Sequence, residues 1–188
     1  MHVVTHLLAG WLIADETGLV HRDKALVTWA SVIADVDGLG VVVDTANKML
    51  GLKETAYYEI YHHFLGHGLF GAAVTTVLAY ACAVNRRVTA LFALLAFHLH
   101  LLMDLAGSRG SNPVDIWPIN YLAPFSVTPS IAWSGQWPLT GWQNTSITVL
   151  LMLACIMTAI RRGRSPVALF SRHADLEFVK VLRRRFSG

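Results

Sequence analysis

Several His and Asp side chains stand inside or beside apolar segments of this sequence, where ionisable groups are uncommon. A charged side chain at the centre of a membrane costs roughly 2.5 kcal/mol or more, so such groups persist when they are paired or bind an ion. Hardly any Lys or Arg stands at similar depth to balance the aspartates. A divalent cation would supply that charge, and imidazole with carboxylate suits Zn²⁺ first, with Mn²⁺ or Fe²⁺ as alternatives. The candidates are His6, Asp35, Asp37, His62, His63, His67, His98, His100 and Asp104.

Spacing groups some of these candidates on shared helix faces. His100 and Asp104 are separated by one helical turn, as are His63 and His67, so the two residues of each pair can bind the same metal ion. His62 and His67 lie five positions apart and need a bend or a helix start between them. Whether His62 or His63 is the ligand stays open at this point.

Asp35 and Asp37 point to opposite sides of an ideal helix because they are two positions apart. Gly38 and Gly40 follow, so a break in the helix could turn both carboxylates inward. Otherwise one Asp binds the metal and the other orients a ligating His. For His98 the simpler interpretation is a hydrogen-bonded packing residue.

The elements that must position these residues are apolar. Hydrophobic residues make up 54% of the 188-residue chain and charged residues 14%, against about 25% charged in a soluble domain. We therefore expect an all-α, polytopic membrane bundle with about five membrane-embedded helices. A soluble helical domain with an unusually apolar core is the alternative. The apolar segments are residues 3–20, 25–43, 64–84, 88–105 and 146–160.

The basic residues predict an orientation. With five crossings, the loops rich in Lys and Arg fall on one side, and the positive-inside rule then places the N-terminus outside and the C-terminus inside. The His and Asp candidates gather toward the external end in this arrangement, which supports a single site. The basic groups are Arg22 and Lys24, Arg86 and Arg87, Arg161, Arg162 and Arg164, and Arg183, Arg184 and Arg185.

Two regions lie outside the predicted helices. Residues 107–145 form a long loop rich in Trp, Pro and Gly, whose Trp residues suit a membrane–water boundary. Residues 161–188 form a basic cytoplasmic tail with an amphipathic helix, distinct from a metal-binding helical domain at 1–160. The basic runs are not interleaved with aromatic residues, so the predicted partner is the lipid bilayer and not nucleic acid.

The order of these motifs resembles a bacterial inner-membrane family of membrane-bound metal-dependent hydrolases. The motifs are Thr5-His6, Ala34-Asp35-Val36-Asp37, His62-His63-Phe-Leu-Gly-His67 and His100-Leu-Leu-Met-Asp104, followed by a Gly/Pro/Trp-rich loop. The resemblance covers roughly residues 1–126. This chain has Ala34, Gly38, His63 and Gly68 where the family has Pro, His, Arg and Ser. The metal ligands that it implies are His6, Asp35, Asp37, His62, His67, His100 and Asp104.

The resemblance implies hydrolysis in the bacterial inner membrane. The expected substrate is an ester or phosphoester of a lipid or lipid-linked molecule, attacked by metal-activated water at the external face. One or two Zn²⁺ ions would be held, and Asp37 or His63 would accept or deliver the proton. The alternatives are a transporter that uses the same residues as a pathway, and a non-catalytic, metal-stabilised membrane protein.

Overall fold

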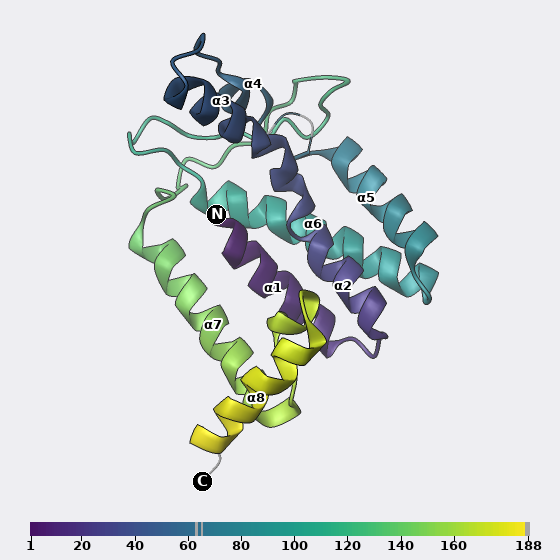
Figure 1. Cartoon of the computed structure of the whole chain (residues 1–188). Coiled ribbons are helices and arrows are strands. Elements are labelled where there is room, and N and C mark those ends of the chain that lie inside the picture. Colours follow the sequence, from purple (N-terminus) through teal and green to yellow (C-terminus); the bar gives the residue numbers. More distant parts are fainter. Residues whose placement is uncertain (63, 65, 187–188) are drawn as a thin grey trace.

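The computed structural model describes residues 1–62, 64 and 66–186, so the expected catalytic residue His63 lies outside the described residues. The described chain is all-helical and contains no β-strand, which confirms the all-α part of the predicted fold class (Figure 1). The helices are α1 (Val3–Glu16), α2 (His21–Ala30), α3 (Gly40–Met49), α4 (Tyr57–Tyr61), α5 (Leu69–Cys82), α6 (Arg86–Gly107), α7 (Trp142–Arg162) and α8 (Arg172–Phe186), with 3₁₀-helices η1 (Ile33–Leu39) and η2 (Pro166–Leu169).

Two helices, α6 and α7, are long and apolar enough to cross a membrane. The segment that starts with α2 and continues through η1 into α3 passes the same test as a pair bent by 50°, which gives a third span if the pair is one broken crossing. The structure does not support five spans. Helices α1 and α5 have 14 residues each and reach only about 21 Å, short of a hydrocarbon core of about 30 Å.

Several boundaries differ from the sequence-based expectations. The segment predicted at 25–43 is interrupted after Ala30, and Gly40 begins a separate helix that continues to Met49. The segment predicted at 64–84 is helical only from Leu69, after an extended Gly68. The last apolar segment is longer than predicted, because α7 begins at Trp142.

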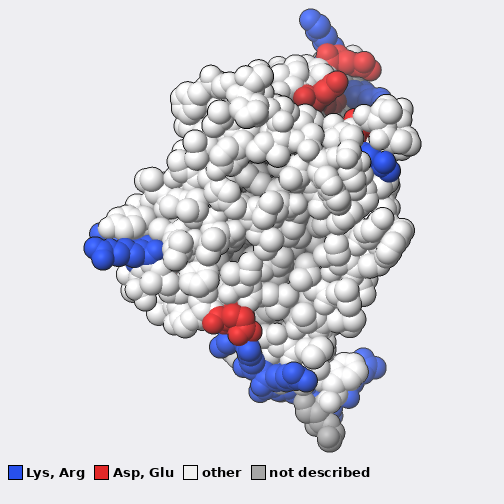
Figure 2. Space-filling view, turned by 180° about the vertical axis from the view of Figure 1, so that it is seen from behind, with Lys and Arg blue, Asp and Glu red and all other residues white. Residues whose placement is uncertain are grey.

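The molecular surface is consistent with membrane association. On the face shown in Figure 2, Lys, Arg, Asp and Glu side chains gather at the periphery, and the broad middle of the face is uncharged. Exposed apolar residues lie along α5, α6 and α7, including Val77, Leu95 and Leu150. An uncharged band between charged ends is what a hydrocarbon layer requires.

Helix α6 lies at the centre, packed against α2 and α5, while α1 packs against α2 and α7. Ala30 of α2, Ala79 of α5 and Ala93 of α6 form one buried cluster. Such small side chains let helix backbones approach closely in apolar surroundings. The close approach positions the segment after α2 over the second half of α6.

Asp23 fixes the opposite end of this arrangement. Its carboxylate accepts hydrogen bonds from the backbone N–H groups of Val84 and Asn85 and from the Thr89 hydroxyl. Val84 and Asn85 lie in the turn before α6 and Thr89 lies in its first turn, so these contacts hold the beginning of α6 in place. The start of α2 is thereby tied to the start of α6, and the residues after α2 meet the far half of α6.

The long connection between α6 and α7 folds back over the end of α6. Its residues 108–141 contain two isolated bridges, Arg109 with Pro138 and Ile119 with Ile131. The buried Gln136 side chain donates to the carbonyls of Asp104 and Leu105 and accepts from the Trp117 backbone N–H. This side chain holds the loop against the helix end that carries the candidate site.

The C-terminal region confirms the predicted helix in part. Helix α7 ends at Arg162, and Gly163 follows with a positive φ of 73°, the left-handed conformation common after helix ends. Helix α8 packs on η2 and α7, and it spans Arg172–Phe186 within the tail predicted at residues 161–188. Asp175 accepts from the backbone and the hydroxyl of Ser165, which fastens α8 to the preceding turn.

Candidate metal centre

Two histidine rings face each other in the interior. His100 Nδ1 donates to the Ser31 carbonyl at 2.9 Å, and His67 Nδ1 donates to Asp37 Oδ2 at 3.0 Å. These bonds fix the tautomer of each ring and direct both Nε2 atoms to one point, where they lie 3.2 Å apart. Two imidazole nitrogens at this distance can share either a proton or a bound cation.

Two carboxylates complete the group. Asp104 Oδ2 lies 3.0 Å from His100 Nε2 and 3.5 Å from His67 Nε2, and Asp35 Oδ1 lies 3.7 Å from each of these nitrogens. Ligand atoms around a tetrahedral ion with bonds of about 2.0 Å are about 3.3 Å apart. The observed distances scatter around that value, so this Asp/His cluster could hold a metal ion.

The charge balance of the cluster also favours a cation. Among the ion pairs of the described residues, no Lys or Arg side chain contacts Asp35, Asp37 or Asp104. The amino group of Met1 contacts Asp104 Oδ1 and supplies one positive charge. Asp35 Oδ2 is buried without a hydrogen-bond partner. A buried carboxylate oxygen without a donor is costly, and a bound cation would remove that cost.

Asp37 connects the cluster to a second histidine. Its Oδ2 accepts from His67 Nδ1 and from the Gly66 backbone N–H at 2.8 Å, while its Oδ1 lies 3.0 Å from His62 Nδ1. A Cβ on Gly66 would lie 3.0 Å from Asp37 Oδ2, so glycine permits this approach. Asp37, His62 and His67 form a second group with metal-ligand spacing.

The 3₁₀-helix η1 resolves the spacing of the two aspartates. Both residues lie in η1, and they reach opposite edges of the same ring: Asp35 lies on the Nε2 side of His67 and Asp37 on the Nδ1 side. The Asp35 and Asp37 side chains can therefore point in opposite directions and still belong to one site, because the His67 ring lies between the two carboxylates.

The carboxylates around His67 create a strong attraction for positive charge. Burial alone would lower the pKa of His67, but hydrogen bonds with Asp104, Asp35 and Asp37 outweigh burial and raise that pKa well above its usual value. The same field that holds a proton on this ring would hold a metal ion.

His6 contacts the cluster from α1. Its ring stacks on His100 with centroids 3.8 Å apart, and its Nε2 lies 3.1 Å from Asp104 Oδ1. The His6 carbonyl accepts from the Ser31 hydroxyl, and a Cβ on Gly10 would collide with that same side chain. His6 is adjacent to the four-residue group and touches it through Asp104, but it is not one of its members.

His98 lies apart from the cluster although it is close to His100 in the sequence. Its Nδ1 donates to the Leu94 carbonyl, and its Nε2 contacts the Tyr121 hydroxyl at 2.9 Å. The structure therefore gives His98 the role of a hydrogen-bonded packing residue.

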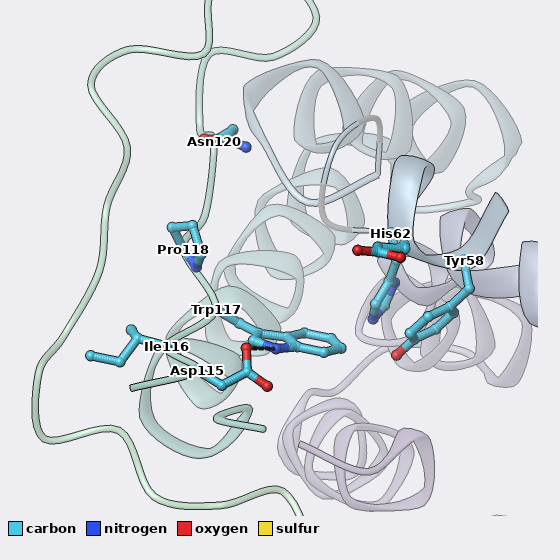
Figure 3. A pocket seen from close by; sticks show the side chains of 8 residues that line it. Tyr58, His62, Asp115, Ile116, Trp117, Pro118 and Asn120 are labelled. Carbon is cyan, nitrogen blue, oxygen red and sulfur yellow. Dashed lines mark hydrogen bonds between the residues drawn. The ribbon is translucent and has the colours of Figure 1, made fainter. Parts of the chain in front are cut away.

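A cavity of about 300 Å³ reaches the cluster from outside. Asp35 and Asp104 line it, together with Tyr58, His62 and Trp117. The same Tyr58, His62 and Trp117 also line a larger cavity of about 550 Å³ (Figure 3). The cluster is buried but not sealed, because its carboxylates face an open space.

The spacing of residues did not identify several parts of this site. Ser31 orients His100, Gln136 holds the loop, and Tyr58 and Trp117 line both cavities. The sequence suggested only a membrane-interface role for Trp117, whereas its ring lies 5.7 Å from that of His62. No spacing signal marks these residues, since they come from loops and short helices.

Comparisons of the chain with family models, with curated proteins and with solved structures find no match. The resemblance to membrane-bound hydrolases therefore stays a prediction, and the function must be inferred from the residues of the site.

Proposed function

We propose that this protein is a membrane-embedded, metal-dependent hydrolase that cleaves an ester or phosphoester of a lipid or lipid-linked substrate. One observation carries the proposal: two imidazole Nε2 atoms and two carboxylate oxygens converge with metal-ligand spacing, and the carboxylates line a cavity. Convergent polar groups of this kind in a concave site are typical of active sites.

The ligand set favours Zn²⁺, with Mn²⁺ or Fe²⁺ as alternatives. The ion would be held by Asp35, His67, His100 and Asp104. His6 would position the Asp104 carboxylate, which its Nε2 contacts. A bound ion of this kind would supply a Lewis acid and would bring the pKa of a water molecule bound to it down toward neutrality. A second ion at Asp37, His62 and His67 is the alternative to a positioning role for Asp37.

Asp37 fits the positioning role closely. A carboxylate that accepts the Nδ1–H of a ligating histidine fixes the ring and raises its basicity, and such partners recur around protein metals. Asp37 accepts from His67 in this way and also contacts His62. We assign proton transfer to neither Asp37 nor His63.

The open cavity favours catalysis over a purely structural metal. Structural zinc sites are usually closed by four protein ligands, whereas catalytic sites keep a position accessible. Four protein ligands would close a tetrahedral ion, so catalysis here requires a further coordination position on the cavity side of the ion, or one Asp that does not bind it. Here Asp35, at 15% exposure, and Asp104 face the cavity. A substrate group could approach the ion from that side.

The position in the fold favours a substrate from the membrane. The cluster lies by the first turns of α1 and the second half of α6, whereas Arg86, Arg161 and Arg162 lie at the opposite helix ends. If the basic end is cytoplasmic, as the positive-inside rule suggests, the cavity opens to the external side. A lipid or lipid-linked phosphoester is the natural substrate there.

The test combines metal analysis with turnover. The wild-type protein purified in mild detergent should contain at least one divalent ion per chain and hydrolyse members of a panel of lipid and water-soluble phosphoesters and esters. His100→Ala should lose both properties. His98→Ala is the matched control, because it removes a histidine from the same helix that does not touch the cluster.

Two results would contradict the proposal. Protein without metal, even after incubation with Zn²⁺, Mn²⁺ or Fe²⁺, would remove its basis. Metal binding without turnover of any member of the panel would instead favour the non-catalytic, metal-stabilised alternative.

A further inference from the structure

The larger cavity lies beside the candidate metal centre, between α4 and the long loop. Figure 3 shows Tyr58 and His62 approaching from the helix side, while Asp115, Trp117, Pro118 and Asn120 follow the loop on the other side. The cavity measures about 550 Å³, enough for a small organic group.

The lining combines aromatic faces with negative charge. Tyr58 and Trp117 contribute rings, and Glu59 and Asp115 contribute carboxylates. No Lys or Arg is among the described residues that line either this cavity or the smaller one at the metal centre. Two carboxylates without a basic partner in the lining create a field that attracts cations and repels anions.

We propose that this cavity binds a quaternary or primary alkylammonium group. The cation would lie against the Trp117 ring, within reach of the Glu59 and Asp115 carboxylates. Tyr58 stacks on His62 with ring centroids 4.6 Å apart and forms the wall behind it. Aromatic rings attract such ions through the negative charge of their faces, and the attraction strengthens when water is excluded.

An ammonium group fits the lining better than the other candidate ligands. An anion would meet Glu59 and Asp115 without a compensating Lys or Arg in the lining. A neutral sugar could stack on Trp117 but would leave both carboxylate charges unbalanced. A monovalent cation is attracted by the ring and by both carboxylates, and it balances one of the two negative charges.

The two cavities adjoin, and this gives the ammonium group a place on the substrate. Tyr58, His62 and Trp117 line both spaces, so a molecule can extend past them from one to the other. With the reacting ester at the metal centre, the larger cavity receives the cationic end of a zwitterionic headgroup. This assignment of the substrate class rests on the proposed hydrolase function, whereas the binding of ammonium does not.

The binding experiment uses the protein as purified, in an uncharged polyoxyethylene detergent. Isothermal titration with tetramethylammonium should give saturable binding. The neutral isostere 3,3-dimethylbutan-1-ol and methyl glucoside should bind at least about tenfold more weakly, because the carboxylates favour the charge. Stronger binding of the glucoside would overturn the proposal in favour of a sugar site.

Variants locate the binding. Trp117→Leu should weaken tetramethylammonium binding about tenfold, and Trp117→Phe, which keeps a ring, should restore most of it. Trp142→Leu is the control, since Trp142 is 74% exposed and does not line the cavity. Unchanged affinity in Trp117→Leu would refute the site.

The charge is tested separately. Asp115→Asn should weaken binding about threefold while keeping an acceptor for the Trp117 indole N–H. Glu54→Gln, an exposed acid outside the lining, should change nothing.

A comparison of substrates separates this proposal from the proposed function. With phosphoesters of choline and of glycerol, Trp117→Leu should raise KM for the choline ester alone. Ammonium binding without hydrolysis would overturn the hydrolase function and leave the ammonium site intact. Hydrolysis without preference for the choline ester, together with no ammonium binding, would overturn the ammonium site and leave the hydrolase function intact.

Discussion

A buried acidic site lies at each end of helix α1, and the negative charge of the two sites is compensated in different ways. Near its C-terminus, Asp15 contacts Lys24 at 3.6 Å, Arg162 at 3.0 Å and the side chain of Arg164. Near its N-terminus, about 14 Å away along the helix, His6 leads to Asp104 and its histidine neighbours. The first site is a closed ion-pair network and the second has no Lys or Arg side chain within the described ion pairs.

This difference separates a structural site from a candidate functional one. Buried carboxylates must be compensated, and fixed cationic side chains do so permanently. Histidine rings compensate only when they are protonated or when they share a metal ion with the carboxylates. The candidate metal centre therefore depends on bound protons or a bound metal ion, which the Asp15 network does not need.

The largest effect is expected when a ligand of the candidate metal centre is removed. His67→Ala should lower the affinity for Zn²⁺ by more than about 100-fold, because even the outer partners of metal ligands contribute 10–100-fold. Competition with a chromophoric chelator measures this affinity. His173→Ala, in the exposed part of α8, is the matched control. Equal affinities in the two variants would contradict the assignment of the cluster.

The next effect comes from the residue behind the ligand. Asp37→Asn should lower the affinity for the ion about 10–100-fold, since the amide orients His67 less firmly than the carboxylate. A metal-to-protein ratio that is halved at saturation would instead show that Asp37 holds a second ion. The same chelator titration, with metal analysis at saturation, distinguishes the two results.

The third prediction concerns the ion-pair network around Asp15. Arg162→Gln combined with Arg164→Gln should lower the free energy of unfolding only modestly, because these side chains are 43% and 46% exposed and water screens their charge. Denaturant unfolding in detergent measures the loss, with Arg161→Gln as control. The affinity for divalent ions should not change, and a large change would mean that the two ends of α1 are not independent.

The smallest effect sharpens the contrast between neighbouring histidines. His98→Ala should leave metal affinity within about twofold of wild type and cost about 1 kcal/mol in unfolding free energy, through the lost contact with Tyr121. Chelator competition and denaturant unfolding on the same sample provide both values. Loss of metal from this variant would show that His98 acts on the cluster after all.

The sequence predicted the helical class and which residue types could bind a metal. These predictions follow from local properties: apolar segments favour helices, and ionisable groups within them need compensation. The equal spacing of His63/His67 and His100/Asp104 could not show which of these pairs contributes both residues to the site. His100 and Asp104 both join the cluster, whereas His63 lies outside the described residues.

The number of spans could not be predicted from composition. The first and third apolar segments have the composition of membrane helices, but their helices end after 14 residues. Helix ends depend on capping and on tertiary contacts, such as the extended Gly68 before α5 and the Thr17 hydroxyl bonded to the Ala14 carbonyl. A hydropathy pattern does not contain that information.

The sequence alone thus determined that buried His and Asp residues would need compensation, because their burial is a consequence of the apolar residues around them. Only the tertiary structure decided how. It set Asp15 beside Arg162 and Asp104 beside His100 and His67. Partners from distant segments meet only when helices pack, so the difference between a closed ion-pair network and a candidate metal centre is a property of the fold.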